Sequence, residues 1–204
     1  AHEADLALAR NEYWGWMHGM PHAVKDLTPV KGFLYTKGSP MFAKRIAEED
    51  GALVTKIRNQ GAIFIGKTNV PEFGLGSQTY NNVFGATGNA FNSELAAGGS
   101  SGGAASALAL RLLPVADGSD MMGSLRNPAA YNNVVGFRPS MGRIPSEGVD
   151  VFFKQLTTPG PMGRTVDDTI LLFSTMAGQH PFSPLSHWPA LGEPEKYESL
   201  APDD

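Results

Sequence analysis

The chain has 204 residues, no cysteine and a net charge of −4, with 42% hydrophobic and 18% charged residues. This composition is typical of a globular protein with a sizeable core, and it excludes disulfides and thiolate chemistry. Because the balance of charge is mildly acidic, we expect neither direct nucleic-acid binding nor attachment to an anionic membrane.

The N-terminal region shows no basic segment followed by an apolar core, which a secretory signal would need. The best apolar run, residues 104–116, is short and is interrupted by Arg111 and Pro114. We therefore predict a cytoplasmic protein without a membrane anchor. The chain begins with Ala1 rather than methionine, which suggests a processed or excised polypeptide.

The first half of the chain alternates helical and strand-like patterns. We expect a strand at His22–Asp26, which ends in charged residues, and a buried parallel strand at Ala62–Gly66. Helices are predicted for Ala4–Arg10, for Met41–Asp50 after a Ser39-Pro40 cap, and for Ala52–Gln60.

The second half continues this alternation, which favours an α/β fold with helices covering a sheet. The predicted elements are a helix at Gly103–Leu112, strands at Pro114–Asp117 and Val134–Phe137, a short helix at Asn127–Ala130, and a helix at Ile170–Ala177. Five prolines follow His180. We expect residues 1–179 to form the core and residues 180–204 a linker or docking tail.

Two glycine-flanked serines dominate the sequence, in Gly98–Gly103 and in Asp120–Arg126. Glycine allows positive φ and close approach of the backbone, so each hydroxyl can be presented at a helix N-terminus. The intervening helix and strand return the chain to the same end of a sheet. Ser100 and Ser124 can therefore meet in space.

The segment Ala96–Pro145, with the motifs GGSSGG and DMMGSLRNPA, resembles the signature region of the amidase signature family of Ser-Ser-Lys amide hydrolases. The resemblance extends to PHAVKDL at Pro21–Leu27, to Gly61–Thr79 and to Thr157–Asp168. It implies an α/β fold with a mixed, largely parallel sheet, incomplete at its C-terminal end. The chain then corresponds to the N-terminal and central portion of a longer bacterial amidase.

The resemblance also implies the roles of three residues. Ser124 is the nucleophile that forms an acyl-enzyme, Ser100 relays its proton, and Lys25 is the terminal base. Serine needs such a neighbouring base to become a strong nucleophile. Lys25 accepts a proton near neutral pH only if burial lowers its pKa.

Further features follow from the same resemblance: a cis peptide bond between Gly99 and Ser100, and a supporting polar network. The backbone N–H groups of Met121, Met122 and Gly123 are the implied oxyanion donors, and the supporting network is Ser101, Asp120 and Arg126. The family usually has glycine at the position of Met122. If that position requires positive φ, methionine costs about 1–2 kcal/mol there, which opens the hypothesis of reduced activity or a narrowed pocket.

The residues alone leave other kinds of site open. Gly98–Gly102 also fits the nucleophile elbow G-x-S-x-G, with Asp168 and His180 downstream. The same glycines before a helix fit a phosphate-binding loop, although the Walker lysine is absent. His18 and His22 have the spacing of a helical zinc pair, but glycine and proline lie between them. Lys67 fits an ion pair with a carboxylate such as Glu72.

Three functions remain in view. The first is an amidase that hydrolyses a small-molecule amide with neither metal nor cofactor. The second is an amidotransferase A-type subunit, which acts on a mischarged transfer RNA together with partner subunits. The third is an inactive, truncated amidase that serves as a scaffold. A homodimer is also open.

Overall fold

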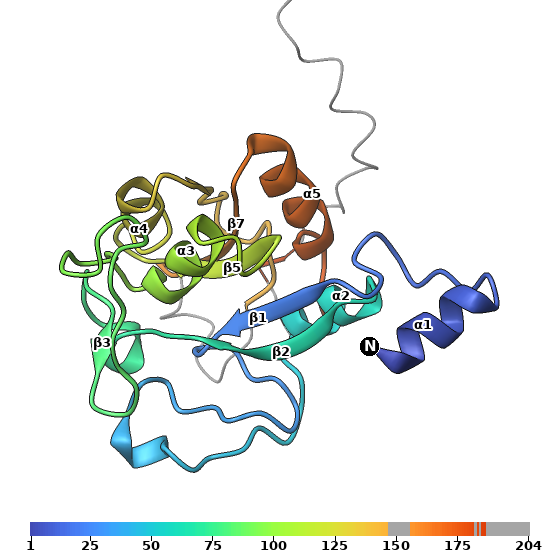
Figure 1. The fold of residues 1–204 in the computed structure, drawn as a ribbon, viewed down its shortest axis with the longest axis horizontal. Helices are drawn as coiled ribbons and strands as arrows, with labels where there is room; N and C mark the ends of the chain where they lie inside the picture. Colours follow the sequence, from blue (N-terminus) through green and yellow to red (C-terminus); the bar gives the residue numbers. More distant parts are fainter. Residues whose placement is uncertain (147–155, 182, 184, 187–204) are drawn as a thin grey trace, which may run out of the picture.

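The computed structural model describes residues 1–146, 156–181, 183 and 185–186 (Figure 1). Its α-helices are α1 (His2–Ala9), α2 (Ala52–Asn59), α3 (Gly102–Ala109), α4 (Arg126–Tyr131) and α5 (Val166–Met176). Its strands are β1 (Pro21–Lys25), β2 (Ile63–Thr68), β3 (Tyr80–Asn81), β4 (Gly85–Ala86), β5 (Val115–Asp120), β6 (Val135–Gly136) and β7 (Thr158–Gly163). Two short 3-10 helices cover Pro40–Phe42 and Glu72–Gly74.

The strands β1 and β2 form the parallel pair that their apolar runs predict, with Lys25 opposite Thr68 and Val24 opposite Lys67. Strand β5 lies beside β1 near the centre of the molecule (Figure 1). This arrangement places the carboxyl end of β1 in the interior of the fold. Functional side chains gather at the carboxyl ends of parallel strands.

A second sheet has the strand order β5-β7-β6, and both of its pairs are antiparallel. The α/β class is confirmed and the pairing is mixed. Within the described residues, however, only β1 and β2 pair in parallel. The long connection that contains α3 leads from β2 in the first sheet to β5 in the second, so it adds no further parallel strand to the first sheet.

Strand β7 has the sequence TPGPMG and was not predicted, because prolines argue against a strand. Pro161 accepts a hydrogen bond at its carbonyl from Phe137 N, so its edge faces β6 and not β5. Pro159 shares that edge, and β6 is too short to reach it. Neither proline therefore interrupts the ladder between β5 and β7.

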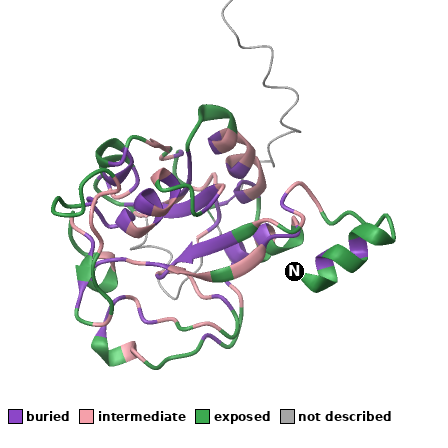
Figure 2. Ribbon diagram, viewed as in Figure 1, coloured by how far each residue is buried: buried purple, intermediate pink, exposed green. Residues whose placement is uncertain are grey.

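The apolar core lies between the strands and the helices that cover them. Figure 2 shows β1, β5 and much of α3 as buried, whereas α1 is largely exposed. One cluster joins α3 to β5 and α4 through Leu108, Ala116 and Ala129. A second joins α2 to α5 through Leu53, Ile57 and Leu172. Leu53 and Ile57 lie four positions apart on the buried face of α2.

One predicted helix is wrong. Ser39 does cap a turn, since its side chain accepts from Met41 N, but only Pro40–Phe42 is helical, and the predicted helix over Met41–Asp50 does not form. The other predicted helices and strands are present with shifted ends. The predicted burial of the strand over Ala62–Gly66 is wrong, however, because β2 is only partly buried and Ile65 is exposed. Most of the predicted tail, residues 180–204, lies outside the described residues. Within the part that is described, no helix has the length and apolarity needed to cross a bilayer.

Candidate active site

Lys25 lies at the end of β1 and its side chain is buried, with 1% exposure. Its Nζ lies 2.9 Å from Ser100 Oγ, 2.8 Å from Ser101 Oγ and 2.9 Å from Ser119 Oγ. A fourth oxygen, the carbonyl of Ser119, is 3.3 Å away. The amine is therefore surrounded by neutral oxygen atoms.

Burial lowers the pKa of Lys25 from 10.5 to about 7, although the nearby carboxylates of Asp117 and Asp120 act in the opposite direction. Burial has this effect because the charged ammonium loses its hydration. Lys25 is consequently close to the point at which it can take up or release a proton at neutral pH.

The GGSSGG motif brings Ser100 and Ser101 to the N-terminus of α3, and the Gly99–Ser100 peptide bond is cis, as the resemblance implies. Its glycines are required by close packing. A Cβ on Gly99 would lie 2.9 Å from the backbone of Gln78, and one on Gly103 would lie 2.4 Å from Asn69 N. Side chains at these positions would displace the hydroxyls from Lys25.

Ser124 follows β5 in a turn where Gly123 has a φ of 111°. The backbone links the two serine motifs, since Ser101 N donates to the carbonyl of Ser124 at 3.1 Å. Ser124 is half-buried. Among the described residues, no hydrogen bond joins the Ser124 hydroxyl to Ser100 or Lys25. The structure thus brings the motifs together through the main chain, without a closed line of hydroxyls.

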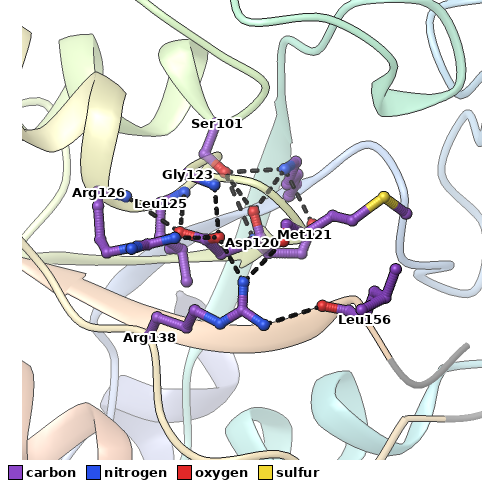
Figure 3. Close-up of polar contacts among 10 residues, drawn as sticks. Ser101, Asp120, Met121, Gly123, Leu125, Arg126, Arg138 and Leu156 are labelled. Atoms are coloured by element: carbon purple, nitrogen blue, oxygen red, sulfur yellow. Dashed lines mark hydrogen bonds and ion pairs between the residues drawn. The ribbon is translucent and has the colours of Figure 1, made fainter.

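Asp120 organises the turn that holds Ser124. One of its oxygens accepts from Gly123 N at 2.7 Å, and the other accepts from Leu125 N at 3.1 Å. Arg126 Nε and Arg138 Nη1 lie 2.9 Å and 3.0 Å from the carboxylate (Figure 3). Burial would raise the pKa of Asp120, but these hydrogen bonds outweigh it and hold that pKa well below its usual range.

The predicted oxyanion donors differ in what they contact. Gly123 N is taken up by Asp120, whereas the amides of Met121 and Met122 form no hydrogen bond to a described residue. Met122 is 84% exposed and is not among the described non-glycine residues with positive φ. Methionine therefore causes no left-handed strain at this position, and that premise of the reduced-activity hypothesis is wrong.

Two residues of this cluster were not predicted from the sequence. Ser119 was missed because the predicted strand ended at Asp117, whereas β5 continues to Asp120. Arg138 lies after β6, where its guanidinium contacts Asp120 and also the carbonyls of Met121 and Leu156 (Figure 3). Nothing in the local sequence around Arg138 indicates that contact.

The other candidate residues have different surroundings. His18 Nε2 lies 3.0 Å from the carbonyl of Ala4, whereas His22 is buried against Asp117. The two imidazoles thus share no site. Lys67 pairs with Asp26 at 3.1 Å rather than with Glu72, so the suggested partner of Lys67 is wrong.

Glu72 instead accepts a hydrogen bond from Ser39. In a nucleophile elbow the base beside the serine is a histidine, but Ser100 Oγ lies beside Lys25 Nζ.

A cavity of about 640 Å³ lies beside the cluster and is lined by Lys25 and Ser119. Its walls include the apolar or aromatic side chains of Leu27, Tyr35 and Phe73. Ser124 is not among its lining residues. The cavity therefore reaches the lysine end of the cluster.

The family model that matches this chain is described as Amidase, and it covers residues 1–201. The chain belongs to the amidase family. It is 42% identical over 178 residues to the A-type subunit of glutamyl-tRNA(Gln) amidotransferase from Coxiella burnetii, with 87% of this chain and 37% of that protein covered. The chain thus spans little more than a third of the length of the curated relatives it matches.

Solved amidase structures share its fold. A bacterial aryl acylamidase of the amidase signature family matches with a TM-score of 0.86 and 33% identity, over 93% of this chain and 40% of the other. The peptide amidase of Stenotrophomonas maltophilia matches with a TM-score of 0.84 and 32% identity, over 91% of this chain and 39% of the other. The amidase fold is therefore retained throughout most of the described residues.

Proposed function

We propose that the protein hydrolyses a carboxylic acid amide through an acyl-enzyme on Ser124, with Ser100 and Lys25 as the proton relay. One observation carries the proposal: a fully buried lysine, with a pKa of about 7, lies 2.9 Å from a serine hydroxyl. A buried amine among neutral oxygens is suited to general-base chemistry near neutral pH.

In the proposed acylation, Ser124 Oγ bonds to the amide carbonyl carbon while its proton passes to Ser100 Oγ. The proton of Ser100 passes in turn to the neutral amine of Lys25. When the tetrahedral intermediate collapses, the carbon–nitrogen bond breaks, and the relay returns the proton to the leaving ammonia or amine. Water then attacks the ester by the same relay and releases the acid and Ser124.

The negative charge of the tetrahedral intermediate would be stabilised by the backbone amides of Met121 and Met122. The Gly123 amide could join them only by leaving Asp120, which it now contacts at 2.7 Å. Losing one such donor typically costs about 2.7–4 kcal/mol of barrier. Ser101, Asp120 and Arg126 would hold the lysine and the turn in place.

The adjoining cavity reaches Lys25 and Ser119 and would place a small organic substrate at the lysine end of the relay. Two of the matched structures are named as an aryl acylamidase and a peptide amidase, which supports the same reaction class. No cofactor or metal ion takes part in the proposed steps.

The proposal is tested by treating the full chain with a serine-directed sulfonyl fluoride and measuring intact mass. We expect one adduct on Ser124, absent from Ser124→Ala and at least about 100-fold slower to form in Lys25→Ala. Lys67→Ala is the matched control, because it removes a buried lysine that pairs with a carboxylate. Labelling of Ser124 at the parent rate in Lys25→Ala would refute the relay.

A second candidate is an amidotransferase component that works with partner subunits. The observation that favours it is the 40–42% identity to proteins named as the A-type subunit of glutamyl-tRNA(Gln) amidotransferase. Amide hydrolysis by the protein alone would favour the amidase, whereas activity only with added partner subunits would favour the amidotransferase. Light scattering on the same sample would test the predicted homodimer.

A further inference from the structure

A buried acid and a buried histidine lie next to the backbone of Lys25. Asp117 is 1% exposed and His22 is fully buried. His22 Nε2 lies 3.2 Å from Asp117 Oδ1, and the backbone N–H of Lys25 donates to both carboxylate oxygens at 3.3 and 3.2 Å. The proposed relay leaves Asp117 and His22 without a role.

Two side chains of strand β5 contact Lys25, one at its backbone N–H and one at its side-chain amine. Asp117 and Ser119 are two positions apart and so lie on the same face of the strand. Asp117 holds the main-chain N–H of Lys25, while Ser119 Oγ lies 2.9 Å from its Nζ. Because β1 and β5 belong to different sheets, the carboxylate provides a polar connection between them.

The state of His22 follows from its two nitrogens. Nδ1 is buried and has no hydrogen-bond partner among the described residues, whereas Nε2 faces Asp117. A neutral imidazole has one donor and one acceptor, and an unused acceptor is less costly to bury than an unused N–H of an imidazolium. His22 therefore donates Nε2–H to Asp117 and leaves the carboxylate its negative charge.

That charge acts on the lysine. Besides His22, the charged or titratable groups around this region are Asp120 on β5, Asp26 after β1, Lys67 on β2, and Tyr35 and Lys37, which line the cavity beside Lys25. Asp117 favours the protonated form of Lys25 and acts in the same direction on Lys67, which is itself paired with Asp26. Asp120 has two arginine partners, whereas the partners of Asp117 are an imidazole and a backbone amide.

We propose that Asp117 and His22 form a positioning pair for Lys25, in which Asp117 fixes the lysine against β5 and its charge partly offsets the effect of burial on the amine. The proposal rests on the function proposed above. Asp117 acts through Lys25 and does not contact the reacting atoms.

The test is the pH profile of Ser124 labelling by the sulfonyl fluoride, measured on the full chain. Asp117→Asn retains the acceptor for Lys25 N but removes the charge, so the ammonium form of Lys25 becomes less stable. We expect the acid limb of the profile to move to lower pH by about one unit. A solely structural role would lower the rate or the melting temperature without moving the limb.

Asp50→Asn is the matched control, because Asp50 pairs with Arg58 and accepts from Lys31 N on another part of the chain. Its profile should coincide with that of the parent. An Asp117→Asn profile that coincides with the parent's would overturn the proposal.

A second pair of variants decides the matter if circular dichroism shows that Asp117→Asn does not fold. His22→Gln retains an N–H donor for Asp117, whereas His22→Leu removes it and leaves the charge of Asp117 less compensated. We expect the acid limb to move to higher pH in His22→Leu and to stay in place in His22→Gln. Coincident profiles of the two variants would contradict the proposal.

Failure of this inference and failure of the proposed function give different results. If the parent is not labelled on Ser124, or if labelling does not depend on Lys25, the proposed function itself is wrong. If labelling depends on Lys25 but substitutions at Asp117 and His22 do not move its pH profile, only the positioning pair is refuted.

Discussion

Two lysines lie on neighbouring parallel strands and have opposite surroundings. Lys25 ends β1 and Lys67 lies in β2, one position away in register. Burial lowers the pKa of both side chains, yet Lys67 has the carboxylate of Asp26 at 3.1 Å, whereas the amine of Lys25 has only serine oxygens within hydrogen-bond distance among the described residues.

This difference assigns the two residues different tasks. An adjacent carboxylate stabilises the ammonium form, so Lys67 is suited to remain a structural cation. The amine of Lys25 has no carboxylate within hydrogen-bond distance among the described residues, and burial lowers its pKa to about 7, which suits the proton exchange with a serine that we propose. A buried lysine becomes a base through the charge of its neighbours as well as through burial.

The largest effect is expected when the two lysines are replaced in turn and Ser124 labelling is measured. Lys25→Ala should slow the labelling by about 10²–10⁴-fold, because a positioned general base contributes that much. Lys67→Ala should change the rate by less than about tenfold. The comparison would be broken if the two variants lost activity equally while both retained their circular dichroism spectra.

Stability should show the reverse order. Lys67→Ala leaves the buried carboxylate of Asp26 without its cation, and breaking such a pair costs about 3–5 kcal/mol. Lys25→Met removes a buried amine that contacts neutral oxygens, so we expect it to cost less. Urea unfolding at pH 7 measures both values, and a smaller loss for Lys67→Ala would contradict the assignment.

Asp120 is a buried carboxylate whose charge, like that of Lys67, is compensated by oppositely charged partners. Asp120→Asn removes the negative charge between two arginines and replaces one acceptor oxygen with an NH2 donor, which weakens the turn around Gly123. We expect a loss of about 2–3 kcal/mol and slower labelling. Because the folded-state pKa is lowered, the carboxylate stabilises the fold at neutral pH and this stability is lost as the pH falls. The variant should therefore show a flatter dependence of unfolding free energy on pH in acid.

The pH dependence of the parent follows from Lys25. In the proposed mechanism the neutral amine is the base, so labelling of Ser124 should rise as the pH passes through about 7 and then level off. The sulfonyl fluoride assay between pH 5 and 9 measures this limb. A labelling rate that still rises steeply at pH 9 without levelling off would mean that burial does not lower the pKa of the amine.

The smallest effect is expected at Met122. Its side chain is exposed and its backbone lies outside the left-handed region, so Met122→Gly should leave the labelling rate within about threefold. Glycine would add conformational freedom to the backbone at position 122, but it would relieve no left-handed strain there. A rate increase of tenfold or more would restore the hypothesis that methionine limits the reactivity of Ser124.

The sequence by itself determined the α/β class, most helices and strands, and the glycine-flanked serine motifs, whereas the pairing of Lys25 with Ser100 was expected only from the family resemblance. Glycine spacing and apolar periodicity are local signals, so they can be read without a structure. The cis bond at Ser100 and the place of Lys25 at a strand end were also expected, the first from the family resemblance.

Only the tertiary structure decided which strands pair and which charges meet. The strand β7 was not predicted because it contains prolines, and it forms because the edge that carries them faces the short strand β6. The predicted helix over Met41–Asp50 does not form, although its cap does. Arg138 and Ser119 reach the cluster, and Lys67 finds Asp26 rather than Glu72. These contacts join residues distant in sequence, and their energies depend on burial that no local pattern specifies.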